Sequence, residues 1–282
     1  DSYTAVQAGF DPANICMHGN NKTTEELQMA LDYKVGRIVV DNIYELKQLN
    51  QMAGAQHVTA NILFRIKPGV DAHTHNFIRT GQIDSKFGFA LETGEAFEAV
   101  KTALQCEHLH LSGLHCHIGS QILDTEGFVA AAEIMMQFYA KIKNELGVEL
   151  HDLNLGGGFG IQYTEQDDPL PYEAYMEAVA KVINRCSQEL QVKRPFILIE
   201  PGRSIVAPAG ITLYTVGGKK EIPNIRTYLS IDGGMCDNPR YILYQSEYDA
   251  LIANKADQPK TATVTIAGKC CESGDLLSLI HI

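Results

Sequence analysis

The chain has 282 residues, of which 45% are hydrophobic and 20% charged, as is ordinary for a globular protein with a substantial core. Its 34 acidic and 23 basic residues give a net charge of -11. This charge argues against nucleic acid or an anionic membrane surface as a partner, because both attract basic patches. Seven cysteines without a CxxC pair indicate reduced thiols in a cytoplasmic protein, and no apolar stretch is long enough to span a membrane.

Short apolar runs rich in β-forming residues recur in the first two thirds of the chain and predict six strands, at 14–20, 36–42, 61–69, 111–119, 152–160 and 196–203. Amphipathic patterns between them predict helices at 23–33, 43–53, 94–105, 127–146 and 172–190. The first helix opens like a capping box, with Thr23 or Thr24 as its N-cap and acids in its first turn.

The alternation of strands and helices predicts an α/β fold with a parallel sheet. Nearly every strand ends in polar or glycine-rich residues, as in a TIM-type (β/α)8 barrel, whose active site lies at the C-terminal ends of its strands. A Rossmann sheet is the alternative, but no early GxGxxG follows a first strand. We therefore expect residues 1–207 to form a barrel, of which six of eight strands can be counted.

The pattern changes after about residue 208. Alternating segments at 210–222, 226–234 and 261–273 are separated by turn signals, without long helical spacers. We expect an all-β domain over 208–276.

Two histidines in "HLHLSGLHCHIGSQ" attract attention, since His115 and His117 share one face of the predicted strand. No zinc-type spacing surrounds them, so no metal site is expected. A structural histidine and a cofactor or substrate contact both remain open. His117 is the better candidate for a contact because it lies nearest the C-terminal end of the strand.

Two further motifs follow predicted strands. "LGGGFG" (155–160) suits a phosphate site built from backbone N–H groups, although a tight turn is the alternative. In "IEPGRS" (199–204), Glu200 could contact a protonated ring nitrogen and Arg203 a carboxylate, unless the two form a surface ion pair. Lys86 suits a Schiff base in isolation, but a solvated or ion-paired lysine is the simpler interpretation.

Seven strings in register resemble diaminopimelate decarboxylases, a family of pyridoxal-phosphate enzymes with an alanine-racemase-like barrel. They are "HGNNKT", "HTHNFIRTGQIDSKFGF", "HCHIGSQ", "NLGGGFGI", "EPGRSIV", "DGGMCDNPRYILY" and "KCCESGDLL". The resemblance implies decarboxylation of meso-2,6-diaminopimelate to L-lysine and carbon dioxide, with pyridoxal 5'-phosphate as cofactor. Ornithine and arginine decarboxylases share the barrel, and a non-catalytic relative is the other alternative.

The resemblance also implies roles for individual residues. His117 would stack on the pyridine ring, Glu200 would face its nitrogen, and the phosphate would be held by Ser120, Gly156, Gly157 and Gly158, with Gly202 and Arg203 nearby. Arg203, Arg240 and Tyr244 would bind the distal end of the substrate. Cys271 would be the proton donor, Cys270 structural, and Glu272 a substrate contact from the second subunit of a homodimer with a shared active site.

The sequence departs from the family in two places. The Schiff-base lysine belongs to an "AVKAN"-like string that is absent here, and neither Lys22 nor Lys86 inherits its role. No tyrosine that would contact the cofactor follows "CESGD". We therefore expect a fragment without turnover of its own, and expect the last residues, "LSLIHI" (277–282), to be non-native.

Overall fold

The computed structural model describes residues 2–69 and 84–281, so most of the motif at 73–89 lies outside the described residues. The chain divides into two compact units. Unit 1 contains Asp1–Gly160 and Leu170–Arg203, and unit 2 contains Ile161–Pro169 and Ser204–Ile282. Among the described helices, none is both long and apolar enough to cross a membrane.

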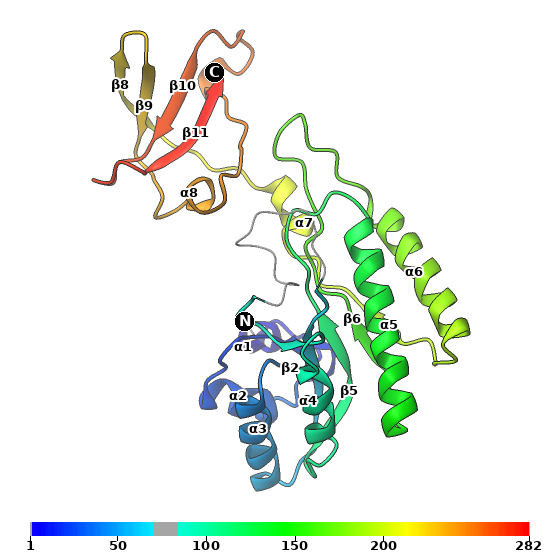
Figure 1. Ribbon diagram of the computed structural model, residues 1–282. Helices are drawn as coiled ribbons and strands as arrows, with labels where there is room; N and C mark the ends of the chain where they lie inside the picture. Colours follow the sequence, from blue (N-terminus) through cyan, green and yellow to red (C-terminus); the bar gives the residue numbers. More distant parts are fainter. Residues whose placement is uncertain (1, 70–83, 282) are drawn as a thin grey trace. The chain divides into compact units, whose positions relative to one another are not determined.

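Unit 1 is built on a parallel sheet of seven strands with the order β1-β2-β3-β5-β6-β7, in which β4 also pairs with β3 (Figure 1). The strands are β1 (Cys16–Met17), β2 (Arg37–Val40), β3 (Ala60–Lys67), β4 (Phe89–Ala90), β5 (Leu109–Cys116), β6 (Asp152–Asn154) and β7 (Phe196–Leu198). All six predicted strands are present. The seventh, β4, was not predicted, because two residues are too few to show a period.

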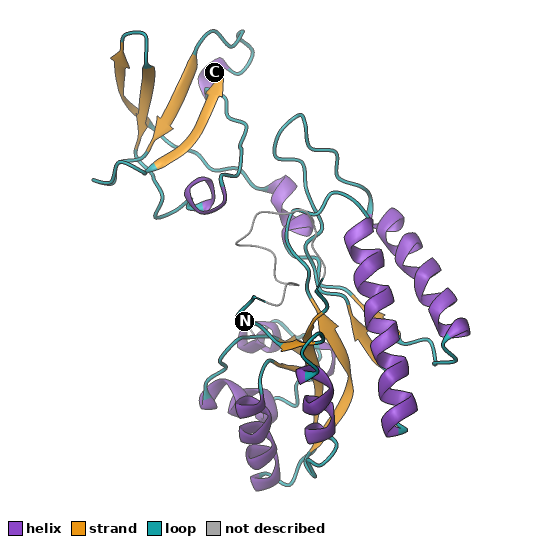
Figure 2. Ribbon diagram, viewed as in Figure 1, coloured by secondary structure: helices purple, strands orange, loops and turns teal. Residues whose placement is uncertain are grey.

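Helices separate the strands along the chain and flank the sheet (Figure 2). They are α1 (Ser2–Gln7), η1 (Pro12–Asn14), α2 (Thr24–Asp32), α3 (Ile43–Ala55), α4 (Glu95–Ala103), α5 (Glu126–Leu146), α6 (Tyr172–Glu189) and, from Arg203 into unit 2, α7 (Arg203–Val206). The capping box is confirmed with Thr23 as the N-cap, because its Oγ1 accepts from the Glu26 N–H at 3.2 Å and its N–H donates to the Glu26 carboxylate at 2.8 Å. Parallel strands joined by helices confirm the expected α/β, TIM-type architecture.

An aromatic cluster fixes the loop after β6 against α5 and α6. The Phe128 ring stacks on Phe159 with centroids 4.9 Å apart, and the edge of Tyr175 meets Phe159 at 5.2 Å. The Tyr175 hydroxyl donates to the Ile122 carbonyl at 2.9 Å. All three rings are buried, so the glycine-rich segment that ends at Phe159 is held by core packing.

Unit 2 contains a four-stranded sheet with the order β11-β10-β9-β8. Its elements are η3 (Ala207–Ala209), β8 (Val216–Ile222), β9 (Arg226–Ile231), α8 (Arg240–Tyr244), η4 (Ala253–Lys255), β10 (Thr263–Ala267) and β11 (Leu276–His281). β9 and β10 are parallel, and the other two pairs are antiparallel. The predicted strands β8, β9 and β10 are confirmed, whereas no strand was expected at β11.

Candidate active site

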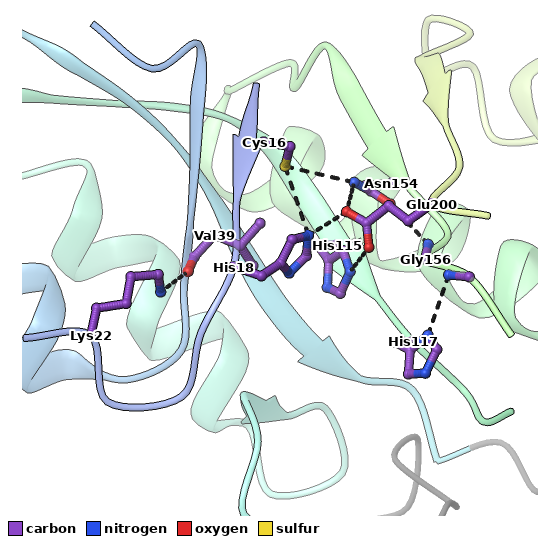
Figure 3. Close-up of polar contacts among 10 residues, drawn as sticks. Cys16, His18, Lys22, Val39, His115, His117, Asn154, Gly156 and Glu200 are labelled. Atoms are coloured by element: carbon purple, nitrogen blue, oxygen red, sulfur yellow. Dashed lines mark hydrogen bonds and ion pairs between the residues drawn. The ribbon is translucent and has the colours of Figure 1, made fainter. Parts of the chain in front are cut away.

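The side chain of Glu200, just after β7, is the centre of a polar cluster in unit 1 (Figure 3). Its partners are His115 from β5, Asn154 from β6 and His18 from the segment that follows β1. These strands are parallel, so their C-terminal ends meet at one edge of the sheet. The Glu200 N–H donates to the Gly156 carbonyl at 2.8 Å, which fixes the backbone beside the cluster.

Both carboxylate oxygens of Glu200 accept hydrogen bonds. Oε1 accepts from Asn154 Nδ2 at 2.8 Å and contacts His18 Nε2, while Oε2 lies 3.4 Å from His115 Nε2. Asn154 is fully buried and its Oδ1 accepts from the Gly156 N–H at 2.8 Å, so its orientation is fixed from both ends. Three side chains therefore hold the carboxylate at one position.

The surroundings of Glu200, His115 and His117 shift the pKa values of these side chains. Burial by itself raises the pKa of Glu200, but hydrogen bonds from His115 and His18 outweigh it, and the resulting pKa lies well below its ordinary value. Burial lowers the pKa of His115 to about 4, although its bond to Glu200 opposes the shift. Burial also lowers the pKa of His117 to about 4. At neutral pH the site thus presents an ionised carboxylate beside two neutral imidazoles.

The three glycines after β6 allow close approaches of the backbone. Gly156 and Gly158 have φ of 69° and 103°, a region that favours glycine. A Cβ on Gly157 would lie 2.2 Å from the Glu200 carbonyl, and one on Gly158 would lie 2.2 Å from that of Gly119. The Gly156 N–H bonds to Asn154 and the Gly157 N–H donates to His117 Nδ1 at 3.3 Å. In this turn the backbone therefore passes close to the carbonyls of Glu200 and Gly119 and also contacts His117.

Ser120 and Arg203 lie together although they are distant in sequence. Arg203 Nη2 donates to Ser120 Oγ at 2.8 Å, and its Nη1 donates to Gln121 Oε1 at 3.4 Å. Gly202 is exposed, and no atom lies within 4 Å of where its Cβ would be. The resemblance had placed these residues near one phosphate, and the contact joins two of them.

Neither lysine that was set aside has the surroundings of a reactive amine. Lys22 is buried, and its Nζ donates to Glu45 Oε1 at 2.7 Å, to the Val39 carbonyl at 2.6 Å and to the Gly19 carbonyl at 2.9 Å. Lys86 is exposed and lies 5.1 Å from the Phe87 ring centroid. Lys22 thus anchors the loop that carries His18.

The remaining predicted site residues belong to unit 2. Arg240 begins α8, donates to Ser246 Oγ at 3.2 Å, and lies over the rings of Tyr163 and Tyr244 at 5.3 and 5.6 Å. Its Nε is buried and has no hydrogen-bond partner among the described residues. The two aromatic rings therefore position the guanidinium, while its Nε–H donates to no described residue.

Cys271 and Glu272 lie in the exposed turn between β10 and β11. Cys270, beside them, has its Sγ 3.6 Å from Cys236 Sγ, and its N–H donates to the buried Asp275 at 2.8 Å. The Glu272 carboxylate accepts from the Gly274 N–H at 3.2 Å. The turn is thus organised by Asp275 and presents Cys271 on its surface.

His18, Asn154 and Cys16 contribute to the site without having been predicted from the sequence. Cys16 Sγ lies 3.8 Å from His18 Nε2, and burial raises the pKa of the thiol to about 12. The sequence signal for His18 is its place at the polar end of the first predicted strand. Asn154, the last residue of β6, offered no signal besides its place before the glycines.

Comparison with known proteins places these features in context. The family model for the pyridoxal binding domain of pyridoxal-dependent decarboxylases matches residues 3–207. The chain is 50% identical over 275 residues, or 98% of its length, to diaminopimelate decarboxylases of Bacillus methanolicus and Bacillus subtilis. It spans 64% and 63% of the lengths of these relatives.

Solved structures agree in fold. A diaminopimelate decarboxylase from M. jannaschii in complex with L-lysine matches with a TM-score of 0.85 and 35% identity, over 98% of this chain and 62% of that one. The enzyme from Helicobacter pylori, also complexed with L-lysine, matches with a TM-score of 0.85 and 30% identity, over 99% of this chain and 67% of that one.

Proposed function

Because this chain belongs to the pyridoxal-dependent decarboxylases, we propose that it serves in the decarboxylation of meso-2,6-diaminopimelate to L-lysine and carbon dioxide. The observation that carries the proposal is its 50% identity to diaminopimelate decarboxylases over 275 residues. The proposal includes a role in lysine biosynthesis and a cytoplasmic location, which agrees with seven free cysteines.

The residues of unit 1 fit the cofactor that the family name implies. Glu200 is an ionised carboxylate in a partly buried site, which is what a protonated pyridine nitrogen requires as a partner. When bound, pyridoxal phosphate supplies an electron sink for the pair left behind by carbon dioxide. We assign Glu200 the task of keeping the ring nitrogen protonated, a task that a neutral amide would perform less well.

The neutral imidazole of His117 is suited to stack on the ring, because it brings no positive charge against a protonated pyridine. For the phosphate we propose Ser120 Oγ and Arg203, which already contact each other at 2.8 Å, with the backbone of Gly156, Gly157, Gly158 and Gly202. The close approaches at Gly157 and Gly158 support this, since any side chain there would fill the turn.

In unit 2 we propose that Arg240 and Tyr244 bind the distal amino-acid end of the substrate, together with Arg203. The Arg240 Nε without a partner among the described residues supports this, because a substrate carboxylate would satisfy it. Cys271 would deliver a proton to one face of the reacting carbon, and its exposed thiol is accessible for that task. Glu272 would contact substrate bound to the second subunit of a homodimer.

The test is a substrate comparison with this sequence extended to the full length of its relatives. Carbon dioxide release is measured with meso-diaminopimelate, ornithine and arginine at equal concentrations and with added pyridoxal phosphate. We expect meso-diaminopimelate to be preferred by about 10⁴-fold in kcat/KM, because ornithine leaves the distal carboxylate site unpaired. Equal or greater turnover of ornithine or arginine would reject the assignment of substrate, and no turnover of any of the three would favour a non-catalytic relative.

A further inference from the structure

We propose that Cys16, His18 and Glu200 form a binding site for a zinc-type divalent metal ion. Each offers one ligand atom, and these atoms lie within 4.8 Å of one another. Thiolate sulfur, imidazole nitrogen and carboxylate oxygen are the three ligand types that zinc takes in proteins. Three protein ligands with one position left for water is the usual arrangement of an open zinc site.

The spacing of the ligands suits tetrahedral coordination at one pair and requires a small movement at another. Bond lengths of about 2.3 Å to sulfur and about 2.0 Å to nitrogen place tetrahedral S and N ligands about 3.5 Å apart. Cys16 Sγ and His18 Nε2 are 3.8 Å apart. The His18–Glu200 contact is a direct hydrogen bond, so an ion bound between these two side chains would replace that bond and widen the pair.

Neighbouring side chains hold the ligands in the way that outer-shell partners hold them in known metal sites (Figure 3). Asn154 Nδ2 donates to Glu200 Oε1 at 2.8 Å and lies 3.9 Å from Cys16 Sγ, so one amide contacts two of the three ligands. His115 Nε2 lies 3.4 Å from the other oxygen of Glu200. Asn154 is fully buried, which leaves this amide little freedom to move away.

The site is accessible to an ion from solvent, because the side chains of His18 and Glu200 each retain 29% of their exposure. Coordination would form a sulfur–metal bond as the Cys16 thiol releases its proton to water, without transfer of electrons. Affinity should therefore rise with pH.

The test uses the 282-residue chain, with Zn²⁺ in a calorimeter and Co²⁺ as a spectroscopic probe. We expect one ion per chain and, with Co²⁺, a thiolate-to-metal charge-transfer band. Cys16→Ser should abolish the band and raise the Kd for Zn²⁺ at least about 10-fold, since even loss of outer-shell partners costs 10–100-fold. Cys106→Ser, which changes another half-buried thiol of the same unit, should leave both unchanged.

Two results would overturn the proposal: a Co²⁺ complex without the band, or a Zn²⁺ affinity that Cys16→Ser leaves unchanged. Thermal melts of each variant show whether it is folded, and His18→Gln provides a second ligand deletion with the same expected loss of affinity.

A competition experiment separates this inference from the proposed function, which also employs Glu200. If both hold, pyridoxal phosphate raises the apparent Kd for Zn²⁺ when the chain is extended to the full length of its relatives, so that the cofactor site is complete. If it does not, but Cys16→Ser still abolishes the Co²⁺ band, the metal site stands and the proposed cofactor role of Glu200 fails.

Discussion

Replacement of His115 by glutamine should make unit 1 less sensitive to acid. His115 is fully buried, its Nε2 faces Glu200, and its Nδ1 has no hydrogen-bond partner among the described residues. A second proton on the ring would therefore be buried without an acceptor. Burial accordingly lowers the pKa of His115 from 6.5 to about 4 in the folded chain.

The sign and size of the effect follow from linkage. Between these two pKa values the unfolded chain binds a proton that the folded chain does not, so stability is complete above pH 6.5 and falls as the pH drops toward 4. A pH of about 5 lies about 1.5 units below the pKa of His115 in the unfolded chain, so the loss of unfolding free energy there is about 2 kcal/mol. His117, whose pKa is lowered in the same way, should add a similar loss.

The assay is urea unfolding followed by circular dichroism at about pH 7.5 and about pH 5. Between these conditions His115→Gln should lose about 2 kcal/mol less than the unaltered chain. His110→Gln, an exposed position on the same strand, is the control and should behave like the unaltered chain. An equal loss in His115→Gln and the unaltered chain would refute the argument that a buried neutral imidazole controls acid stability.

Three further predictions concern the glycine turn, the buried lysine and the thiol. Gly157→Ala should cost about 1–3 kcal/mol by overpacking against the Glu200 carbonyl, whereas Gly202→Ala, with open space around it, should stay within about 0.5 kcal/mol by urea unfolding. Lys22→Met should cost about 3–5 kcal/mol in the same assay, because it leaves Glu45 buried and unpaired. The control, Lys101→Met, changes an exposed ion pair and should cost under about 1 kcal/mol. Equal losses in the two variants would contradict this prediction. In the chain extended to the length of its relatives, Cys271→Ala should lower kcat for meso-diaminopimelate roughly 10²–10⁴-fold. Cys106→Ala should keep the normal rate, and a normal rate in Cys271→Ala would exclude this thiol as the proton donor.

Local patterns predicted much of the fold. The helices α2 to α6 and six strands of the parallel sheet were expected from periodicity, and a capping box with Thr23 or Thr24 as the N-cap was expected at the start of α2. These features depend on residues a few positions apart, which a sequence displays directly. The strand β11 was missed because the resemblance to the family ends at the same residues.

Long-range contacts account for what the sequence did not predict. His18 and Glu200 are 182 residues apart, and only the order of strands in the sheet brings them together. Asn154 was overlooked for the same reason, since its partners come from β7 and from the following turn. Glu200 was singled out from its place at a strand end, but its two histidine partners require the fold.

The account depends most on the carboxylate of Glu200 as the partner of the cofactor ring. The direct measurement is carbon dioxide release from meso-diaminopimelate by the extended chain that carries Glu200→Gln. The unaltered extended chain is measured beside it, at equal occupancy by pyridoxal phosphate. Our account predicts that kcat falls by roughly 10²-fold or more, because an amide cannot keep the ring nitrogen protonated as a carboxylate does. A Glu200→Gln variant that turns over meso-diaminopimelate at the unaltered rate would contradict it.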